Sequence, residues 1–355
     1  MKIILIGLTG IGNTILFLPS LKALKDNKKD TFITLLTSQN ESLFNFLIEN
    51  RMIDKIISFK NKNLFRIIII IIKIFFERYD ASFTLYSGKT VNKLKLFTFF
   101  IHARKRYIHG DKNLILDKLN NVVPYENIHD IQQNLNLIKF FLYDYNINLL
   151  DFYYNKKIYN NFFKEIGIIS KVKNENINSF KILIGIHPLA SHTYSKIWSL
   201  DNYIKLINIL NKRFECKFRI FGSSEEREVL MKMQQKLNIK NVETFISLNF
   251  PELINKISDC QFFICNDSSL MHIASFSDVY VFALFGPTDI KRTHPFTNKS
   301  SVISINYPCS PCIEEKKYIK CKHFNCMKLM DVEYVSEIIT KKILEYLIEK
   351  NNGLY

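Results

Sequence analysis

The chain has 355 residues, of which 47% are hydrophobic and 23% are charged. This length suits two domains of about 150 residues, and the composition excludes a disordered chain, a collagen-like chain and a disulfide-stapled mini-protein. The 49 Lys and Arg residues outnumber the 33 Asp and Glu residues and give a net charge of +16. This charge favours a polyanionic partner, such as nucleic acid, a phosphorylated glycolipid or an anionic membrane. A lysine-rich surface that merely follows the Ile-, Asn- and Lys-rich composition is the alternative.

The cysteines and the N-terminus predict a cytoplasmic protein. Seven cysteines are an odd number, and four of them cluster near the C-terminus, unlike a secreted disulfide framework. The apolar run from Lys2 to Gly7 is too short for the core and cleavage site of a signal peptide. We interpret this run as a buried first strand.

Both halves of the chain show the alternation of strands and helices that is typical of an α/β fold. In the first half we predict strands at 2–7, 31–37 and 81–86 and helices at 14–25, 42–49 and 130–145. In the second half we predict strands at 181–186, 217–221, 262–265 and 279–285 and helices at 200–213, 224–237 and 267–276. The polar segment 171–179 is predicted to be the linker.

Two such halves predict two Rossmann-like domains whose parallel sheets face a central cleft. We expect an N-terminal domain at 1–172, a C-terminal domain at 180–332 and a C-terminal helix at 333–355. The apolar segment 64–76 is shorter than the roughly 20 residues of a membrane span and contains Arg66 and Lys73. We predict a buried helix or strand there, with a contact at a membrane interface as the alternative.

The first strand is followed by Gly10-Ile11-Gly12-Asn13-Thr14. Glycines at this place let a ligand approach the backbone and the amides of a helix N-terminus. The spacing is not a complete G-x-G-x-x-G fingerprint, which disfavours a nicotinamide cofactor. A plain strand-to-helix turn is the alternative.

Polar segments also follow the strands of the second half. The segment 187–198 (HPLASHTYSKIW) has hydroxyl groups and Lys196, which suit a diphosphate because hydroxyls donate hydrogen bonds and the ammonium group neutralises charge. Glu226, in FGSSEE, is suited to accept hydrogen bonds from ribose hydroxyls, although an ordinary helix cap at Ser224 is the alternative. The segments 266–272 (NDSSLMH) and 285–289 (FGPTD) follow two further strands, so polar groups converge on one sheet edge.

In this order, the segments resemble glycosyltransferase family 9, the heptosyltransferases of lipopolysaccharide inner-core assembly and their relatives. The resemblance covers the glycine turn with Pro19, the HPxAS…KxW segment, Gly222 to Glu226, NDSxxMHIA, FGPTD and the C-terminal cysteines. It implies a GT-B fold and an inverting mechanism without a catalytic metal. It also implies that the C-terminal domain holds a nucleotide-sugar donor and the N-terminal domain holds the acceptor.

The resemblance also implies roles for single residues. It places Ser191 and Lys196 at the donor diphosphate and Glu226 at the ribose, and it makes Lys196 and Asn13 the catalytic candidates. The complete set of binding candidates is Gly10, Gly12, Ser191, Lys196, Glu226, Asp267, Ser268, His272, Thr288 and Asp289.

Three residues depart from the family pattern. Relatives commonly have Asp at the position of Asn13, where it is the general base for the acceptor hydroxyl, and an amide cannot take that proton. Leu189 and Ser269 stand where relatives usually have glycines, which indicates a less close approach to the donor or a different sugar. Substitute bases are His102, His109 and Asp111, each of which we otherwise interpret as a surface residue.

Four C-terminal cysteines form a C-x2-C-x8-C-x4-C array, with His323 as a spare ligand. Thiolates at this spacing suit a structural zinc ion, and free or paired thiols are the alternative. The array consists of Cys309, Cys312, Cys321 and Cys326.

The sequence therefore predicts a cytoplasmic glycosyltransferase, peripheral to the inner membrane, that transfers heptose from ADP-heptose to a lipopolysaccharide-core or related acceptor. Basic residues in the N-terminal half are predicted to form the docking face for this anionic glycolipid, with a solvated surface as the alternative; they are Arg104, Lys105, Arg106 and Lys112. A GT-B enzyme for another nucleotide sugar, or a non-catalytic nucleotide-sugar-binding homologue, is the alternative function. No helix-turn-helix, zinc-finger or RNA-stacking motif supports a nucleic-acid partner.

Overall fold

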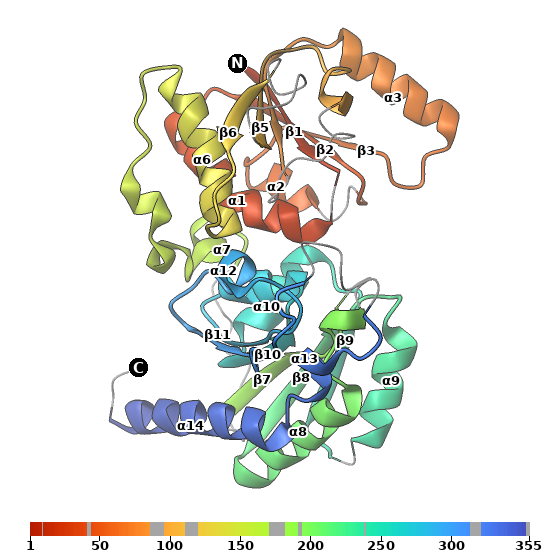
Figure 1. Cartoon of the computed structure of the whole chain (residues 1–355), viewed down its shortest axis with the longest axis vertical. Coiled ribbons are helices and arrows are strands. Elements are labelled where there is room, and N and C mark those ends of the chain that lie inside the picture. The colour runs from red at the N-terminus through yellow and green to blue at the C-terminus, as the bar shows by residue number, and fades with distance from the viewer. Residues whose placement is uncertain are drawn as a thin grey trace. The chain divides into compact units, whose positions relative to one another are not determined.

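In a computed structural model the chain forms two compact units, each built on a parallel β-sheet (Figure 1). Unit 1 comprises Met1–Ile168 with Asn249–Pro251, and unit 2 comprises Ile169–Leu248 with Glu252–Tyr355. The predicted linker at 171–179 lies outside the described residues. The structure describes residues 1–8, 10–40, 44–85, 96–110, 120–169, 182–190, 194–237, 239–312 and 321–352.

The described part of unit 1 has a six-stranded sheet in the order β3-β2-β1-β4-β5-β6. The chain moves outward from β1 to β3 and then returns to place β4 beside β1, so the strand order reverses there as in Rossmann folds. The strands are β1 (Lys2–Gly7), β2 (Phe32–Thr37), β3 (Lys55–Ser58), β4 (Tyr79–Thr84), β5 (Ala103–Gly110) and β6 (Asn121–Pro124). The helices are α1 (Ile11–Asn27), α2 (Asn45–Glu49), α3 (Leu64–Phe76), α6 (Asp130–Tyr143), α7 (Phe162–Glu165) and the 3-10 turns η2 (Asp151–Tyr154) and η3 (Lys156–Tyr159).

Unit 2 repeats this arrangement. Its described strands form the order β12-β11-β10-β7-β8-β9, in which the order reverses between β7 and β10. The strands are β7 (Ile182–His187), β8 (Cys216–Gly222), β9 (Val242–Ile246), β10 (Phe262–Asn266), β11 (Tyr280–Leu284) and β12 (Ser300–Ile303). The helices are α8 (Leu200–Arg213), α9 (Arg227–Lys236), α10 (Phe250–Ser258), α11 (Ser269–Ser275), α12 (Ile290–Thr293), α13 (Asn325–Lys328), α14 (Val332–Asn351) and the 3-10 turn η4 (Tyr194–Lys196).

The core of unit 2 lies where helices cover the sheet. All residues of β7 and β10 are buried, as is typical of parallel strands with helices on both faces. Helix α14 packs against α8, and its Val335, Ile339 and Ile343 are buried in the same cluster as Trp198. The last helix is therefore part of the core of unit 2.

Helix α3 differs from its prediction. The segment 64–76 is helical, but Ile74 alone among its residues is buried, so the expectation of a buried element is wrong. The run contains enough apolar residues to pack one face of the helix on the sheet and to leave another face exposed to solvent. No helix in the described part of the chain combines the length and the hydrophobicity that crossing a membrane requires.

Candidate functional site

The candidate site lies at the carboxyl ends of β7 and β10. These strands are neighbours in parallel register, with His187 paired to Cys265, and they are the point at which the strand order of unit 2 reverses. Ligands of open α/β sheets bind at such points. The predicted donor residues that the structure describes in unit 2 all follow β7, β8, β10 or β11; they are Lys196, Glu226, Asp267, Ser268, His272, Thr288 and Asp289. Ser191 lies outside the described residues.

A buried ion pair joins two of these segments. The Lys196 ammonium group lies 2.6 Å from a carboxylate oxygen of Asp267, and the Asp267 side chain is only 5% exposed. Burial alone would raise the pKa of Asp267, but the charge and hydrogen bond of Lys196 outweigh it and lower that pKa below its ordinary value. Asp267 is therefore an anion that holds Lys196 at the end of β10.

Two buried hydroxyl groups belong to segments at the same sheet edge as this ion pair. Ser195 precedes Lys196, and Thr288 lies in the segment after β11. Thr288 contributes to the low pKa of Asp267, yet neither hydroxyl oxygen has a hydrogen-bond partner of good geometry among the described residues. Since buried polar groups are nearly always hydrogen-bonded in folded proteins, these hydroxyls suit a polar ligand at this edge of the sheet.

His187, the last residue of β7, connects two further candidates. Its Nδ1 lies 3.0 Å from the Ser268 hydroxyl, and its Nε2 lies 3.7 Å from a carboxylate oxygen of Glu226. The sequence does not identify His187 as a site residue, because only the neighbouring positions of β7, β8 and β10 bring it to both partners. Its imidazole fixes the positions of the groups around it.

Glu226 immediately precedes α9, which begins at Arg227, so the alternative of a helix cap at Ser224 is wrong. The Ser223 amide donates a hydrogen bond of 2.8 Å to the Glu226 carboxylate. Burial would raise the pKa of Glu226, but His187 and Ser223 lower it overall. Glu226 is therefore ionised at neutral pH and is suited to accept hydrogen bonds from a ligand.

His272 is buried within α11. Burial lowers its pKa to about 4, against an opposing effect of the Asp267 charge. The imidazole is consequently neutral at physiological pH, when it has one nitrogen that donates and one that accepts a hydrogen bond. This places an uncharged polar group beside the Lys196 and Asp267 ion pair.

Asn266 holds the segments of the site together. Its side-chain oxygen accepts hydrogen bonds from the backbone amide of Trp198 at 3.2 Å and from the Tyr203 hydroxyl at 3.1 Å. Its amide group donates a bond of 2.8 Å to the Pro188 carbonyl. One buried side chain at the end of β10 thereby fixes the start and the end of the segment that contains Lys196.

Asp289 has a local structural role. Its carboxylate accepts a hydrogen bond of 2.9 Å from the Lys291 amide and caps α12. Nearby, Gly286 leaves no room for a side chain unless α13 repacks, because a Cβ atom there would lie 2.5 Å from the Met327 sulfur. The FGPTD segment is therefore fixed both by its cap and by close packing against α13.

In unit 1, Gly10 and Asn13 lie at the start of α1. Helix α1 begins at Ile11, earlier than predicted, so Gly12 and Asn13 are helical residues rather than parts of a turn. Asn13 is a half-buried residue, and its backbone N–H donates a hydrogen bond of 3.1 Å to the Gly10 carbonyl. Among the described residues, no atom lies within 4 Å of the place that a Cβ atom at Gly10 would take, so their arrangement leaves a ligand room to approach the backbone at the switch point between β1 and β4.

A sequence model of glycosyltransferase family 9 (heptosyltransferase) matches residues 119–323, more than half of the chain. The chain belongs to glycosyltransferase family 9. The match contains the site segments of unit 2 and begins after Gly10, Gly12 and Asn13.

The chain is also similar to a curated relative in sequence and to solved structures in fold. The chain is 30% identical to lipooligosaccharide heptosyltransferase 2 of Campylobacter jejuni over 187 residues, which is 50% of this chain and 58% of that protein. The structure of the Escherichia coli ADP-heptose LPS heptosyltransferase II is 17% identical with a TM-score of 0.68, covering 98% of this chain and 99% of that one. A family 9 glycosyltransferase of Veillonella parvula is 18% identical with a TM-score of 0.72, covering 97% of both chains. The predicted GT-B class of α/β fold, with two Rossmann-like domains, is confirmed.

The three substitute bases proposed for this family 9 chain differ in their surroundings. His102 is exposed, and Asp111 lies outside the described residues. The interpretation of His109 as a surface residue is wrong, because its side chain is fully buried near the carboxyl end of β5. Burial lowers the pKa of His109 to about 4 against a smaller effect of the Val123 backbone, and neither ring nitrogen has a hydrogen-bond partner of good geometry among the described residues.

The described residues of the predicted basic docking face do not form one surface. The Arg106 guanidinium donates to the Thr98 and Ile101 carbonyls, both at 3.2 Å, and Lys105 lies 2.8 Å from Asp144. Successive residues of a strand point to opposite faces of the sheet, which separates Lys105 from its neighbours. Arg104 is exposed, and Lys112 lies outside the described residues.

The four clustered cysteines differ in their exposure to solvent. Cys309 is exposed, whereas Cys312 and Cys326 are buried. Burial raises the pKa of Cys326, and the thiols of Cys309 and Cys321 raise it further. Among the described residues, no group of three or more His, Cys, Asp or Glu side chains is arranged to hold a metal ion. Zinc binding by this array stays a prediction.

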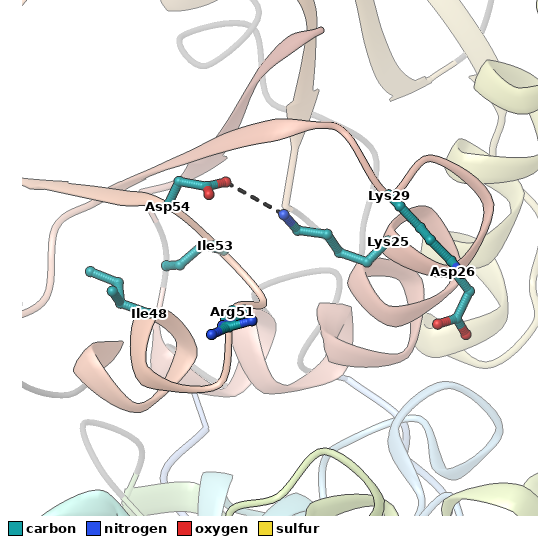
Figure 2. Close-up of a pocket in the computed structure, with 7 residues that line it drawn as sticks. All are labelled: Lys25, Asp26, Lys29, Ile48, Arg51, Ile53 and Asp54. Carbon is teal, nitrogen blue, oxygen red and sulfur yellow. Dashed lines mark hydrogen bonds and ion pairs between the residues drawn. The ribbon is translucent and has the colours of Figure 1, made fainter.

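A hollow of about 620 Å³ lies in unit 1, far along α1 from Gly10 (Figure 2). Lys25 and Lys29 line it at the end of α1, at the edge of the sheet where the strands begin. Figure 2 shows the Lys25 ammonium group directed at Asp54, at a distance of 3.4 Å. Because its charges include such a pair and it lies at the amino edge of the sheet, we do not assign a substrate to it.

Proposed function

We propose that the chain is an inverting glycosyltransferase that needs no catalytic metal and transfers heptose from ADP-heptose to a lipopolysaccharide-core or related glycan. In this proposal the protein is cytoplasmic and peripheral to the inner membrane, where its anionic glycolipid acceptor is anchored. Family membership supports the reaction class, and the names of the Campylobacter jejuni and Escherichia coli relatives support the heptose donor and the acceptor class.

The observation that carries the proposal is the set of polar groups at the switch point of unit 2. Lys196 provides a cation, Ser195 and Thr288 provide buried hydroxyls, and Glu226 provides a carboxylate on the adjacent segment. A nucleoside diphosphate sugar needs a cation for its phosphates, an acceptor for its ribose hydroxyls and polar groups for its sugar. The site offers each of these from strand ends that are fixed by Asn266 and His187.

The chemistry places the largest demand on Lys196. During transfer a bond forms between the acceptor oxygen and the anomeric carbon while the bond from that carbon to the diphosphate oxygen breaks. The diphosphate leaves with the bonding electrons, so negative charge grows on its oxygen. An ammonium group at that oxygen stabilises the transition state more than the ground state, and loss of one such group raises the barrier by about 2.7–4 kcal/mol.

Asp267 is suited to a different task from Lys196. A buried carboxylate would repel the phosphates, but it accepts hydrogen bonds from sugar hydroxyls and keeps the ammonium group in place. Its low pKa keeps it ionised for both tasks. We therefore assign Asp267 to the donor sugar and to the positioning of Lys196.

On the acceptor side, a residue must act as the general base that takes the proton of the acceptor hydroxyl. Asn13 lies at the switch point of unit 1, but its amide cannot accept the proton of the acceptor hydroxyl and serves only to orient that group. Among the substitutes, His109 is favoured by a buried, neutral imidazole near the carboxyl end of β5. Its low pKa makes it a weak base, which predicts slow turnover unless a bound acceptor raises that pKa.

Titration calorimetry with ADP, UDP, GDP and CDP tests the proposal. Selective binding of ADP that is lost in Lys196→Ala supports the ADP-heptose site and leads to turnover assays with ADP-heptose and glycolipid acceptors. Selective binding of another nucleotide contradicts the heptose donor and supports the alternative of a different nucleotide sugar. Binding of ADP-heptose without turnover on any acceptor supports the alternative of a non-catalytic homologue.

A further inference from the structure

Helix α3 presents an exposed apolar face. Leu64, Phe65 and Phe76 are 74%, 71% and 75% exposed, values that are unusual for large apolar side chains. Successive helical residues are about 100° apart, so the exposed apolar residues of α3 fall within a sector of about 120°. This apolar face consists of Leu64, Phe65, Ile68, Ile72, Phe75 and Phe76. A continuous apolar patch on a soluble protein marks a site of contact with a partner or a membrane.

The apolar face is distinct from the side of α3 that packs on unit 1. Ile74 is buried and Ile70 is half-buried in a cluster with Tyr79, Ile101 and Phe97. The Asn63 side chain accepts a hydrogen bond of 2.9 Å from the Arg66 amide and caps the helix. The helix is thus formed and anchored through one side, while Figure 1 shows it, in orange, at the outer side of unit 1.

The charges that border the apolar face are basic. Arg66 and Lys73 are exposed and lie together on one flank of the helix, about 60–80° beyond the apolar sector. Lys60 and Arg78 are exposed beyond the two ends of the helix. The acidic residue of this region, Glu77, is paired with Lys55 at 3.3 Å and Lys2 at 3.7 Å. The border of the face is therefore positively charged, which complements anionic lipid headgroups.

Length and charge together select a bilayer surface as the partner. A helix of 13 residues is about 20 Å long and cannot cross a hydrocarbon layer of about 30 Å, so it would lie in the plane of the interface. A second copy of the chain is disfavoured as the partner. In a twofold dimer this face would meet itself and bring its basic borders together.

We propose that α3 is an interfacial helix that inserts its apolar face into an anionic lipid bilayer while Arg66 and Lys73 contact the headgroups. This inference goes beyond the proposed transferase function and does not depend on catalysis. It names the element through which the chain would reach a membrane-anchored acceptor.

The test is flotation of the full chain with vesicles of phosphatidylethanolamine and phosphatidylglycerol, compared with vesicles of phosphatidylcholine alone. We expect binding to the anionic vesicles, and we expect it to weaken at least tenfold in Phe65→Ser/Phe76→Ser and in Arg66→Glu/Lys73→Glu. Leu150→Ser/Ile348→Ser is the matched control. Both residues are large and apolar and lie outside α3, and they are 62% exposed (Leu150) and 60% exposed (Ile348). Unchanged binding in the α3 variants, or an equal loss in the control, would overturn the proposal.

Two further measurements keep the test specific. Phe65→Trp should show a blue shift of its fluorescence with anionic vesicles, over the constant signal of the buried Trp198. Absence of that shift contradicts insertion. The protein could instead sediment as a dimer that dissociates in Phe65→Ser/Phe76→Ser and fail to bind vesicles. That result would make α3 a self-association face. ADP titration of the same variants separates this question from the donor site, since ADP binding should be unchanged whether or not α3 binds lipid.

Discussion

Lys196 and Asp267 are 71 positions apart in the sequence, yet the Lys196 ammonium group lies 2.6 Å from the Asp267 carboxylate. The pair exists because β7 and β10 are neighbours where the strand order of unit 2 reverses. In the proposed function, the cation of this pair serves the diphosphate and the carboxylate serves a sugar hydroxyl. The pair also links stability to binding, because each partner is partly buried and compensates the other.

The two roles of Lys196 can be separated by a double substitution. Lys196→Ala should weaken ADP binding about 10–150-fold, the loss expected for charge-assisted hydrogen bonds of about 1.5–3 kcal/mol. It should also destabilise the fold by about 3–5 kcal/mol, because it leaves the buried Asp267 charge without its partner. Lys196→Ala/Asp267→Asn should recover much of that stability while ADP binding stays weak.

Calorimetry with ADP and urea denaturation of the wild type and of the two variants measure both effects. Recovery of ADP binding in the double variant would show that Lys196 acts only through the fold. In that case Lys196 would be removed from the phosphate site, and the role of Asp267 at the sugar would have to be tested alone.

Glu226 should contribute to the binding of ADP but not to the binding of pyrophosphate, which lacks the nucleoside. Glu226→Gln keeps the shape of the side chain but removes the charge that strengthens hydrogen bonds from ribose hydroxyls, so ADP binding should weaken about tenfold or more. Binding of pyrophosphate, which has no ribose, should not change. Competition titrations of ADP and pyrophosphate measure the two effects.

Glu225→Gln is the matched control for this substitution, because Glu225 is the adjacent carboxylate and is exposed. It should leave both affinities unaltered. An equal loss of ADP and pyrophosphate binding in Glu226→Gln would mean that Glu226 acts on the site through His187 and Ser223 rather than on the ribose.

Asn13→Asp tests the acceptor side. If the acceptor site of unit 1 is otherwise like that of the family, a carboxylate at this position supplies the missing base, and turnover should be preserved or rise. Turnover of ADP-heptose with a glycolipid acceptor is the measurement, and Asn13→Ala is the control that removes the orienting amide without adding a base. A fall in Asn13→Asp together with a loss in His109→Gln would indicate that the imidazole of His109 takes the proton.

The sequence predicted the elements whose signals are local. Helix α8 has the predicted bounds because Ser199 caps it, accepting a hydrogen bond of 3.2 Å from the Asn202 amide, and because its apolar residues follow a helical period. Strand β5 (ARKRYIHG) was not predicted, since its basic residues hide the strand pattern. The charges of Lys105 and Arg106 are matched by Asp144 and by the Thr98 and Ile101 carbonyls, partners that only the folded chain supplies.

The site itself was predictable as a set of segments but not as a set of contacts. The rule that ligands bind at the carboxyl ends of parallel strands brought Lys196, Glu226 and Asp267 to one edge. The contacts of His187 with Ser268 and Glu226 depend on which strands are neighbours, which the sequence does not state. The exposure of α3 was also beyond the sequence, because a nearly continuous apolar run has no periodicity that identifies the packed face.

The two buried histidines should make the fold sensitive to mild acid. His109 and His272 have pKa values lowered by burial to about 4, whereas their ordinary value is 6.5. Between these values the unfolded chain binds more protons than the folded one, so the free energy of unfolding should fall as the pH decreases from 6.5 towards 4. Each histidine contributes a slope of up to about 1.4 kcal/mol per pH unit, and neither contributes at higher pH.

Asp267 and Glu226, whose pKa values are also lowered, affect the free energy of unfolding in a different pH range. Their stabilisation is lost only as the pH falls below the ordinary pKa values of 3.8 and 4.5.

Urea denaturation between about pH 5 and pH 8 isolates the histidine contribution. His109→Gln should give a shallower decline of the free energy of unfolding below pH 6.5 than the wild type, whatever its effect at neutral pH. His102→Gln, at an exposed position of the same unit, is the control for the removal of an imidazole. A slope in His109→Gln that equals the wild-type slope would show that the folded protein already accommodates the proton on His109. That result would favour His109 as the base, because an imidazole that is readily protonated in the folded state is better able to take the proton of an acceptor hydroxyl.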